Sequence, residues 1–418
     1  MTQTQPKIKL FGTRGSAAAY ALRDFMHRSD IAFEYIELKN DEQARKEAHL
    51  AGLNDPRLPM CVFPDGTRAE RPTLREITER LGWFRNPALS EYDLSIYGAG
   101  PAGLSAAVYG ASEGLKTVLV ERFALGGQAG TSPKIENYLG FPNGISGADL
   151  ADRAREQAIH FGAEILLLRA GVRGQFTPGR GTVYLEDGTK IVSRASICAT
   201  GMEYRKLNLP NEDRLKGAGV YYGAGSSEAS LCWHEHVVVV GGGNSGAQAA
   251  AHFARYASNV SLVVRDRSLK KTVSQYLIDR ISATRNIEVL TCTEVVALHG
   301  DTMLESVTLR NKDTEEERVI KTNWLFLCLG GTPHTDWAIE VGIVRDEAGY
   351  LVTGPDLQTD GHRPPNWPLD RDPYYLETNM PGVFAAGDVR HNSVKRCASA
   401  VGEGAMAVTF VHRYITNG

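Results

Sequence analysis

The chain has 418 residues, of which 42% are hydrophobic and 23% charged, a composition typical of a globular protein with more than one domain. A formal net charge of -3, with both signs mixed along the chain, gives no electrostatic basis for binding nucleic acid or an anionic membrane. No apolar stretch approaches the roughly 20 residues of a membrane-spanning helix, and residues 1–6 are too polar for a secretory signal. We therefore expect a cytoplasmic protein with neither nucleic-acid nor membrane partners.

The six cysteines are scattered along the chain, at positions 61, 198, 232, 292, 328 and 397, and none belongs to a Cys-x-x-Cys motif. This spacing argues against a disulfide framework and favours a reducing compartment. Most of these thiols are expected to be small buried hydrophobic groups, as for Cys198 and Cys328 in strand-like runs. His234 and His236 flank Glu235, but no third ligand follows at a suitable spacing, so we predict no metal site.

Residues 1–84 are predicted to form a small domain with the element order βαβαββα, in which Asp65-Gly66 signals a hairpin turn. This order resembles the thioredoxin/glutaredoxin fold, and Leu58-Pro59-Met60 falls where that family carries its cis-proline. The family's Cys-x-x-Cys would open the first helix, where this chain reads Ser16-Ala17-Ala18-Ala19. The domain is therefore expected to be catalytically silent. Its expected use is to dock or hold a partner, and the alternative is an appendage packed on the next domain.

Residues 85–90 form a predicted linker, and a buried strand then leads into Gly98-Ala99-Gly100-Pro101-Ala102-Gly103, the first glycine finger. Glycine lets the backbone approach a pyrophosphate at such a turn, and the following helix offers free N–H groups to the anion. Glu121 ends the next strand, where its carboxylate can accept hydrogen bonds from ribose hydroxyl groups and repels a 2′-phosphate. The first finger therefore suits FAD or NAD rather than NADP.

A second buried strand leads into Gly241-Gly242-Gly243-Asn244-Ser245-Gly246, the second glycine finger. One such motif is weak evidence, but two in a strand–turn–helix context predict two bound dinucleotides. We expect Gly241, Gly243, Asn244 and Ser245 to contact the second of them.

Cations follow the strand after the second finger. Arg265 ends that strand, Arg267, Lys270 and Lys271 are close by, and Asp266 is expected to point elsewhere. Arg265 and Lys270 are predicted to bind the 2′-phosphate of NADPH, because cations at this place match that group. A solvated basic loop is the alternative.

From about Glu91 to its end, the chain resembles the low-molecular-weight thioredoxin reductases, flavoproteins that carry electrons from NADPH through FAD to a disulfide. Beside the two fingers, the stretches that carry the resemblance are Gly126-Gly127-Gln128, Glu136-Asn137-Tyr138, Ala199-Thr200-Gly201, Gly387-Asp388-Val389 and Lys395-Arg396-Cys397-Ala398. The resemblance implies an α/β protein with two Rossmann-like domains. An FAD-binding domain in two parts, 91–205 and 331–418, would be split by an inserted NADPH-binding domain, 206–330. It also implies a homodimer.

The resemblance assigns further residues to FAD. Beside the first finger and Glu121, the residues expected to contact FAD are Gly127, Gln128, Asn137, Thr200, Gly201, Gly387, Asp388, Arg396, Cys397 and Ala398. Gln128 and Asn137 would contact the flavin ring or its ribityl chain, and Asp388 would bind a ribityl hydroxyl group. The backbone around Cys397 and Ala398 would face the pyrimidine end of the flavin.

One departure from the family changes the expected reaction. The family carries its redox Cys-x-x-Cys in the NADPH domain, shortly after a Gly-Val pair. Here Gly219-Val220-Tyr221-Tyr222 leads into Gly223-Ala224-Gly225-Ser226, so Gly223 and Ser226 stand in the cysteine positions. Disulfide exchange needs a thiolate, which neither residue supplies. We therefore expect hydride transfer from NADPH to FAD and on to another acceptor, such as a ferredoxin-like protein, a quinone, a low-molecular-weight disulfide or oxygen.

Two alternatives stay open. The chain could reduce thioredoxin through other cysteines: Cys232, whose thiol pKa a nearby imidazolium such as His234 would lower, or Cys397, close to the flavin. Both are more readily explained as structural. The chain could instead be a flavin-binding sensor or scaffold that docks partners through its N-terminal domain.

Two further features have expected positions at the active site. His391 could reach the flavin edge and donate a proton. The loop from Gly354 to Tyr375 is rich in proline, aspartate and aromatic residues, and we expect it to pack near the mouth of the active site.

Overall fold

The computed structural model describes residues 7–223 and 228–417 of the chain, which form two compact units. Unit 1 comprises residues 1–76, 131–134 and 204–330, and unit 2 comprises residues 77–130, 135–203 and 331–418. Of the two residues in the cysteine positions, Gly223 is described and Ser226 lies outside the described residues. Among the described helices, none has the length and apolar character needed to cross a bilayer.

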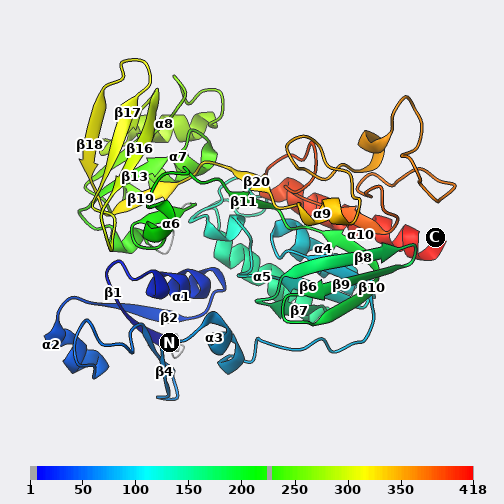
Figure 1. The fold of residues 1–418 in the computed structure, drawn as a ribbon, viewed down its shortest axis with the longest axis horizontal. Coiled ribbons are helices and arrows are strands. Elements are labelled where there is room, and N and C mark those ends of the chain that lie inside the picture. The colour runs from blue at the N-terminus through cyan, green and yellow to red at the C-terminus, as the bar shows by residue number, and fades with distance from the viewer. Residues whose placement is uncertain (1–6, 224–227, 418) are drawn as a thin grey trace. The chain divides into compact units, whose positions relative to one another are not determined.

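The N-terminal module, residues 7–76 of unit 1, is the blue four-stranded sheet of Figure 1. The sheet order is β2-β1-β3-β4, with β1 parallel to β2 and antiparallel to β3, and the elements follow the expected order βαβαββα. Its elements are β1 (Ile8–Thr13), α1 (Ala17–Arg28), β2 (Phe33–Leu38), α2 (Asp41–Gln43), the π-helical turn η1 (Ala44–Ala48), β3 (Met60–Val62), β4 (Arg68–Glu70) and α3 (Leu74–Arg80), which runs on into unit 2.

The local structure of the module follows its sequence signals. Gly66 has a φ of 83° in the turn between β3 and β4, where only glycine adopts such an angle readily. The Leu58–Pro59 peptide bond is cis. Ser16 is the N-cap of α1, because its side chain accepts a hydrogen bond from Ala19 N at 3.2 Å. The residue that opens the first helix thus serves as a helix cap.

Unit 2 is built on a seven-stranded sheet in the order β7-β6-β5-β10-β9-β8, with β21 paired to β10. Strands β7, β6, β5, β10 and β21 are parallel, so their carboxyl ends lie at one edge of the sheet (Figure 1). The strands are β5 (Tyr92–Tyr97), β6 (Thr117–Glu121), β7 (Glu164–Leu167), β8 (Gly171–Thr177), β9 (Arg180–Leu185), β10 (Lys190–Cys198) and β21 (Val383–Ala385). The helices include α4 (Pro101–Ser112), α5 (Gly147–His160), α9 (Trp337–Glu340), η4 (Gly354–Leu357) and α10 (Cys397–Asn417).

The rest of unit 1 holds a parallel sheet in the order β12-β19-β13-β14-β15 and an antiparallel sheet in the order β16-β17-β18. The strands are β12 (Val220–Tyr222), β13 (His236–Val240), β14 (Asn259–Val263), β15 (Ile287–Leu290), β16 (Thr293–His299), β17 (Ser306–Asn311), β18 (Glu317–Lys321) and β19 (Trp324–Leu327). The helices include α6 (Glu212–Leu215), η3 (Ala229–Leu231), α7 (Asn244–Phe253) and α8 (Gln275–Ala283). Two short strands, β11 (Met202–Tyr204) and β20 (Gly331–Pro333), pair where the chain passes between the units.

Small residues allow the last segment of unit 2 to pack closely against α4. A Cβ added to Gly404 in α10 would lie 2.1 Å from Ala102 O in α4, so only glycine allows these helices to touch. A Cβ on Gly387 would likewise lie 2.9 Å from the Cβ of Ala102. The segment after residue 331 is thereby packed against the start of α4, although it is distant in the sequence.

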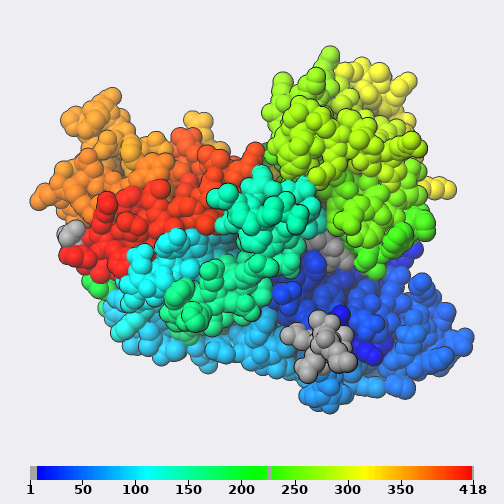
Figure 2. Space-filling view, turned by 180° about the vertical axis from the view of Figure 1, so that it is seen from behind, coloured from blue at the N-terminus to red at the C-terminus, as the bar shows by residue number. Residues whose placement is uncertain are grey.

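The loop from Gly354 to Tyr375 closes on itself and forms the orange lobe beside the red C-terminal helix in Figure 2. Gly354, with a φ of 56°, donates its N–H to Glu377 O at 2.8 Å, and a Cβ there would lie 2.4 Å from Tyr375 O. The expected place of this loop near the active-site mouth stays a prediction.

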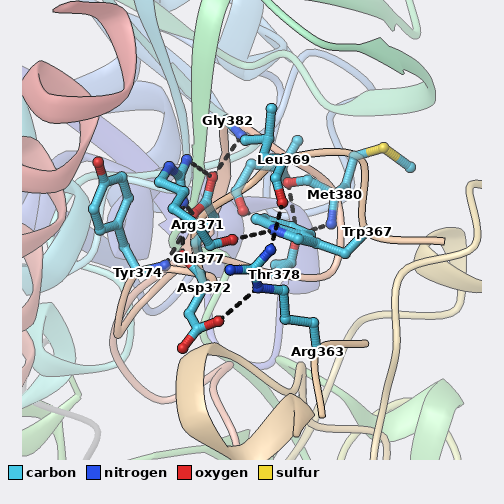
Figure 3. A network of polar contacts seen from close by, with 11 residues as sticks. Arg363, Trp367, Leu369, Arg371, Asp372, Tyr374, Glu377, Thr378, Met380 and Gly382 are labelled. Carbon is cyan, nitrogen blue, oxygen red and sulfur yellow. Dashed lines mark hydrogen bonds and ion pairs between the residues drawn. The ribbon is translucent and has the colours of Figure 1, made fainter. Parts of the chain in front are cut away.

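A buried carboxylate holds the base of this loop (Figure 3). Glu377 is 0% exposed, and Arg371 donates to its two oxygens at 2.7 and 3.0 Å. The same oxygens accept hydrogen bonds from Tyr374 N at 2.9 Å and Gly382 N at 3.0 Å. The guanidinium of Arg371 also lies 3.8 Å from the ring centroid of Tyr374. A bidentate pair of this kind fixes both direction and distance.

We predict that Glu377→Ala destabilises unit 2, because Arg371 and two backbone N–H groups lose their acceptor. Removing one partner of a buried ion pair costs about 3 kcal/mol, which lowers the midpoint of thermal unfolding by roughly 6–12 °C for a unit of this size. Circular dichroism of the purified protein measures the shift. Arg363→Ala is the matched control, since the Arg363–Asp372 pair in the same loop is exposed and is worth less than about 1 kcal/mol. Equal shifts in the two variants would contradict the assignment.

Candidate dinucleotide-binding sites

The first glycine finger joins β5 to α4 and leaves no room for a side chain at Gly98 or Gly103. A Cβ on Gly98, whose φ is 102°, would lie 2.4 Å from Ala199 O, and a Cβ on Gly103 would lie 1.8 Å from Gly98 O. Gly100 is the N-cap of α4 and makes no side-chain cap. The first N–H groups of the helix are therefore left for an external acceptor, as a pyrophosphate requires.

Glu121 lies at the end of β6 and braces the first finger. Its Oε2 accepts a hydrogen bond from Ala99 N at 2.7 Å, and its Oε1 accepts one from Phe123 N at 2.8 Å. The residue is 8% exposed. Each carboxylate oxygen has two lone pairs, so each can accept one further hydrogen bond, as the predicted ribose contact needs.

Other residues predicted to contact FAD gather at the same edge of the sheet. A Cβ on Gly127 would lie 3.0 Å from the Cα of Gly100, and Gly387 is packed against Ala102. Ala199, which contacts Gly98, is followed directly in the chain by two more of them. The residues brought to this edge are thus Gly127, Thr200, Gly201 and Gly387.

The remaining predicted flavin contacts lie on loops or at the start of α10. Gln128 donates from its side-chain amide to Met202 O at 2.8 Å, which fixes the side chain at this end of unit 2. Asn137, Arg396 and Ala398 are exposed. Their contacts with a flavin stay predictions.

Glu403, which the sequence did not single out, holds the turn at Gly387 and Asp388. Its Oε2 accepts a hydrogen bond from Gly387 N at 2.7 Å, and its Oε1 pairs with Arg390 at 2.7 Å. Burial is the main reason why the pKa of Asp388 is raised above its usual value, while the neighbouring Lys395 acts to lower it. The sequence does not single out Glu403, because its contact with this turn depends on how α10 packs beside it.

The two catalytic candidates of unit 2 differ in their surroundings. Cys397 is the first residue of α10, and burial raises the pKa of its thiol to about 11, so it is protonated near neutral pH and a poor nucleophile. His391 Nδ1 lies 2.6 Å from Asp346 Oδ2. This contact engages one ring nitrogen and orients the imidazole, so the other nitrogen, Nε2, is the one suited to proton transfer.

The second glycine finger repeats the geometry of the first in the parallel sheet of unit 1. A Cβ on Gly241, whose φ is 152°, would lie 2.4 Å from Cys328 O at the end of β19. Gly243 is the N-cap of α7 and makes no side-chain cap. Asn244 uses its Oδ1 to accept a hydrogen bond from Ser274 N at 2.8 Å, which ties the finger to the start of α8. The backbone thus offers N–H groups to a second pyrophosphate.

A hollow of about 280 Å³ lies beyond the end of β14. The cations that line it are Arg265, Arg267, Lys271 and Lys312. The other lining residues are Asp266, Ser268, Cys292 and Asp313. Lys271 and Asp266 are thus among the lining residues and Lys270 is not, while the predicted contacts of Arg265 and Lys270 with a 2′-phosphate stay predictions. The backbone of Asp266 is held there because its carbonyl accepts a hydrogen bond from Cys292 N at 3.1 Å.

Lys312 is a site residue that the sequence did not indicate. It lies in the turn between β17 and β18, far along the chain from Arg265, and its N–H donates to Cys292 O at 2.7 Å. In the same turn, Asp313 pairs with Arg267 at 3.2 Å. The backbone hydrogen bond between this turn and Cys292, which follows β15, brings these charges to the hollow.

Gly223, the described one of the two residues expected in the cysteine positions, lies where an added side chain would overlap its neighbours. Gly223 follows β12 with a φ of 87°, and a Cβ there would lie 2.7 Å from the hydroxyl oxygen of Tyr204 and 3.1 Å from Oγ1 of Thr131. These two hydroxyl groups are themselves hydrogen-bonded at 3.2 Å. Tyr204 thus takes up the space into which a cysteine side chain would extend.

The nearby cysteines, Cys232 and Cys328, are free and buried. Cys232 is 0% exposed, its Sγ donates to Glu228 O at 3.3 Å, and burial raises the pKa of its thiol. The expected lowering of that pKa by His234 is therefore wrong, because desolvation dominates. Cys328 is buried as expected, its Sγ donates to Gly223 O at 3.4 Å, and burial raises its pKa to about 12.

Comparisons with known proteins show the family of the chain. Residues 92–364 match the family model described as pyridine nucleotide-disulphide oxidoreductase. Thioredoxin reductase of Bacillus subtilis is 34% identical over 326 residues, which cover 78% of this chain and 95% of that protein. A 34.2 kDa protein in the rubredoxin operon of Clostridium pasteurianum is 32% identical over 333 residues, 78% of this chain and 97% of that protein.

Solved structures give the same result. The crystal structure of Lactococcus lactis thioredoxin reductase matches with a TM-score of 0.69 and 28% identity, and covers 78% of this chain and 100% of that chain. Thioredoxin reductase of T. acidophilum matches with a TM-score of 0.68 and 29% identity, over 78% of this chain and 99% of that chain. The chain therefore belongs to the pyridine nucleotide-disulphide oxidoreductase family, among its thioredoxin reductase-like members.

Proposed function

We propose that the protein passes electrons from NADPH through FAD to an acceptor other than a disulfide of its own. As a thioredoxin reductase-like member of its family, it is an FAD- and NADPH-dependent oxidoreductase. The observation that carries the proposal is Gly223, a residue without a side chain in the first cysteine position, with Tyr204 in the space that the thiol would need. Ser226, in the second position, has no sulfur either.

The residues of unit 2 fit FAD, and those of unit 1 fit NADPH. The uncapped start of α4 suits the FAD pyrophosphate, Glu121 suits its ribose, and the Gly387–Asp388 turn suits its ribityl chain. The start of α7 suits the pyrophosphate of NADPH, and the cationic hollow suits its 2′-phosphate. When bound, FAD supplies a two-electron acceptor for the hydride of NADPH.

A small redox protein is the acceptor class that we favour. One relative is described as a protein in a rubredoxin operon, and a rubredoxin is a small one-electron carrier. A quinone, a low-molecular-weight disulfide and oxygen are the other acceptors compatible with an exposed flavin edge. We further propose that residues 7–84 are a thioredoxin-like domain without redox cysteines, and that the protein acts as a cytoplasmic homodimer.

Thioredoxin reduction through other cysteines is the second candidate function. The relatives named thioredoxin reductase favour it. It requires thiolates, and burial raises the thiol pKa of Cys232 and of Cys397. Their surroundings therefore oppose it. A flavin-binding sensor without turnover is the remaining alternative.

We predict that NADPH bleaches the flavin anaerobically and that the cationic hollow selects NADPH over NADH. Arg265→Ala and Lys271→Ala each remove a charged contact to the 2′-phosphate and weaken binding of 2′,5′-ADP about tenfold, while binding of 5′-AMP stays within about twofold. Isothermal titration measures both affinities, and stopped-flow absorbance measures flavin reduction. Lys270→Ala is the matched control, since Lys270 does not line the hollow. A flavin that stays oxidised and yellow under excess NADPH would contradict the proposed electron transfer from NADPH to FAD.

We predict that the chain with NADPH reduces thioredoxin at under about 1% of its rate with a one-electron acceptor such as ferricyanide, because no thiolate is available to attack a disulfide. Cys232→Ser and Cys397→Ser should leave the ferricyanide rate within about twofold. Insulin precipitation coupled to thioredoxin measures the first rate. Efficient thioredoxin turnover that disappears in either serine variant would establish the second candidate function instead.

A further inference from the structure

The first helix of the N-terminal module packs along the strand that leads to Gly223. The ring of Tyr20 in α1 lies 5.0 Å from the ring of Tyr221 in β12, measured between centroids. A Cβ on Gly217, in the turn before β12, would lie 2.8 Å from Cδ1 of Tyr20 and 3.3 Å from the Cα of Ala17. In Figure 2 the blue surface of the module meets the green surface of the residues after 204. The helix therefore covers β12, the strand that leads to Gly223.

A buried ion pair joins the same helix to Glu228, which lies beyond Gly223 in the chain. Arg23 in α1 donates to Glu228 Oε1 at 2.8 Å, and their side chains are 7% and 2% exposed. Glu228 is the first described residue after position 223. Burial acts to lower the pKa of Arg23, but the Glu228 charge and hydrogen bond leave that pKa raised, so the guanidinium stays charged. A charge buried this deeply is strongly unfavourable without its partner, so the module and Glu228 are held together.

A third contact lies at the exposed rim of the same interface. Arg14, in the turn before α1, donates to Glu235 Oε1 at 2.7 Å and to Asn323 Oδ1 at 3.1 Å. A Cβ on its neighbour Gly15 would lie 3.0 Å from Sδ of Met303. Contacts to the module thus begin before Gly223 and continue beyond it along the chain.

We propose that the N-terminal module is a built-in occupant of this surface, which keeps a separate dithiol protein from reaching the replaced redox centre. A protein disulfide that exchanged electrons at position 223 would have to contact β12, and α1 already packs on this strand through Tyr20 and Tyr221. If the module were free to dock a separate protein, Arg23 would not be buried against Glu228 of its own chain. The inference rests on the proposed function only in that positions 223 and 226 carry no cysteine.

The natural thiol Cys232 reports whether the interface is closed. It is 0% exposed and donates to the carbonyl of Glu228, so iodoacetamide reaches it only when this region opens. In the full-length FAD-bound protein, Arg23→Ala should raise the rate of Cys232 alkylation at least tenfold, measured by peptide mass spectrometry. Cys61, buried in β3 of the module, should stay within twofold and so show that the module remains folded. The exchanged pair Arg23→Glu with Glu228→Arg should restore protection to within threefold of the parent protein.

Two further variants separate the interface from general loosening of the module. Arg14→Ala removes only the exposed rim contact and should raise Cys232 alkylation about twofold. Arg57→Ala breaks an ion pair with Asp55 inside the module and should leave it unchanged. An unchanged Cys232 rate in Arg23→Ala, or an equal rise in Arg57→Ala, would overturn the proposal. If Arg23→Ala also exposes Cys61, the module itself has loosened, and the test then rests on Arg14→Ala. An unchanged rate of Cys232 alkylation in Arg14→Ala would then contradict the proposed interface.

Binding of thioredoxin measures separately whether the N-terminal module blocks this surface. Fluorescein-labelled Bacillus subtilis thioredoxin should show no change in anisotropy with the parent protein and at least tenfold tighter binding to Arg23→Ala. An opened interface without any gain in thioredoxin binding would overturn the exclusion role. Anaerobic flavin bleaching by NADPH should be within twofold of the parent in every variant. A loss of bleaching in the parent protein itself would count against the proposed function and leave this inference standing.

Discussion

The close approach of each glycine finger to a carbonyl group of the neighbouring strand is the constraint on which both nucleotide sites depend. Gly98 meets Ala199 O in unit 2, and Gly241 meets Cys328 O in unit 1. In each case a side chain would push the turn away from its sheet, and the start of the following helix would lose its position. The carboxylate of Glu121 accepts a hydrogen bond from Ala99 N in the first finger. The side-chain amide oxygen of Asn244, in the second finger, accepts one from Ser274 N. The two halves of the catalytic apparatus thus rest on one repeated piece of backbone geometry.

Much of this could be read from the sequence, because local patterns carry it. Strand–turn–helix signals located both fingers, alternation and turn residues gave the order of the N-terminal module, and the absence of sulfur at position 223 was visible directly. The parts that could not be read depend on tertiary packing. Lys312 reaches the cationic hollow through a hairpin, and Glu403 reaches Gly387 from a later helix. No periodicity in a single segment reports contacts of this kind.

The thiols illustrate a second limit of sequence reasoning. A histidine next to Cys232 suggests activation, yet the decisive quantity is burial, which raises the pKa of that thiol. Cys232 is buried in one apolar cluster with Tyr221, Trp324 and Phe326, and the ring of Tyr221 stacks on the other two. The aromatic residues that make the domain core compact are thus also the ones that keep its sulfur unreactive.

The filled space at Gly223 has a consequence for engineering a thiol into this turn. A cysteine there would place its Cβ 2.7 Å from the hydroxyl oxygen of Tyr204, at a φ of 87° that favours glycine. Installing a Cys-x-x-Cys would therefore require a smaller residue at position 204, a relaxed turn and a second sulfur at position 226. A lone cysteine at position 223 would strain the turn and have no partner for exchange.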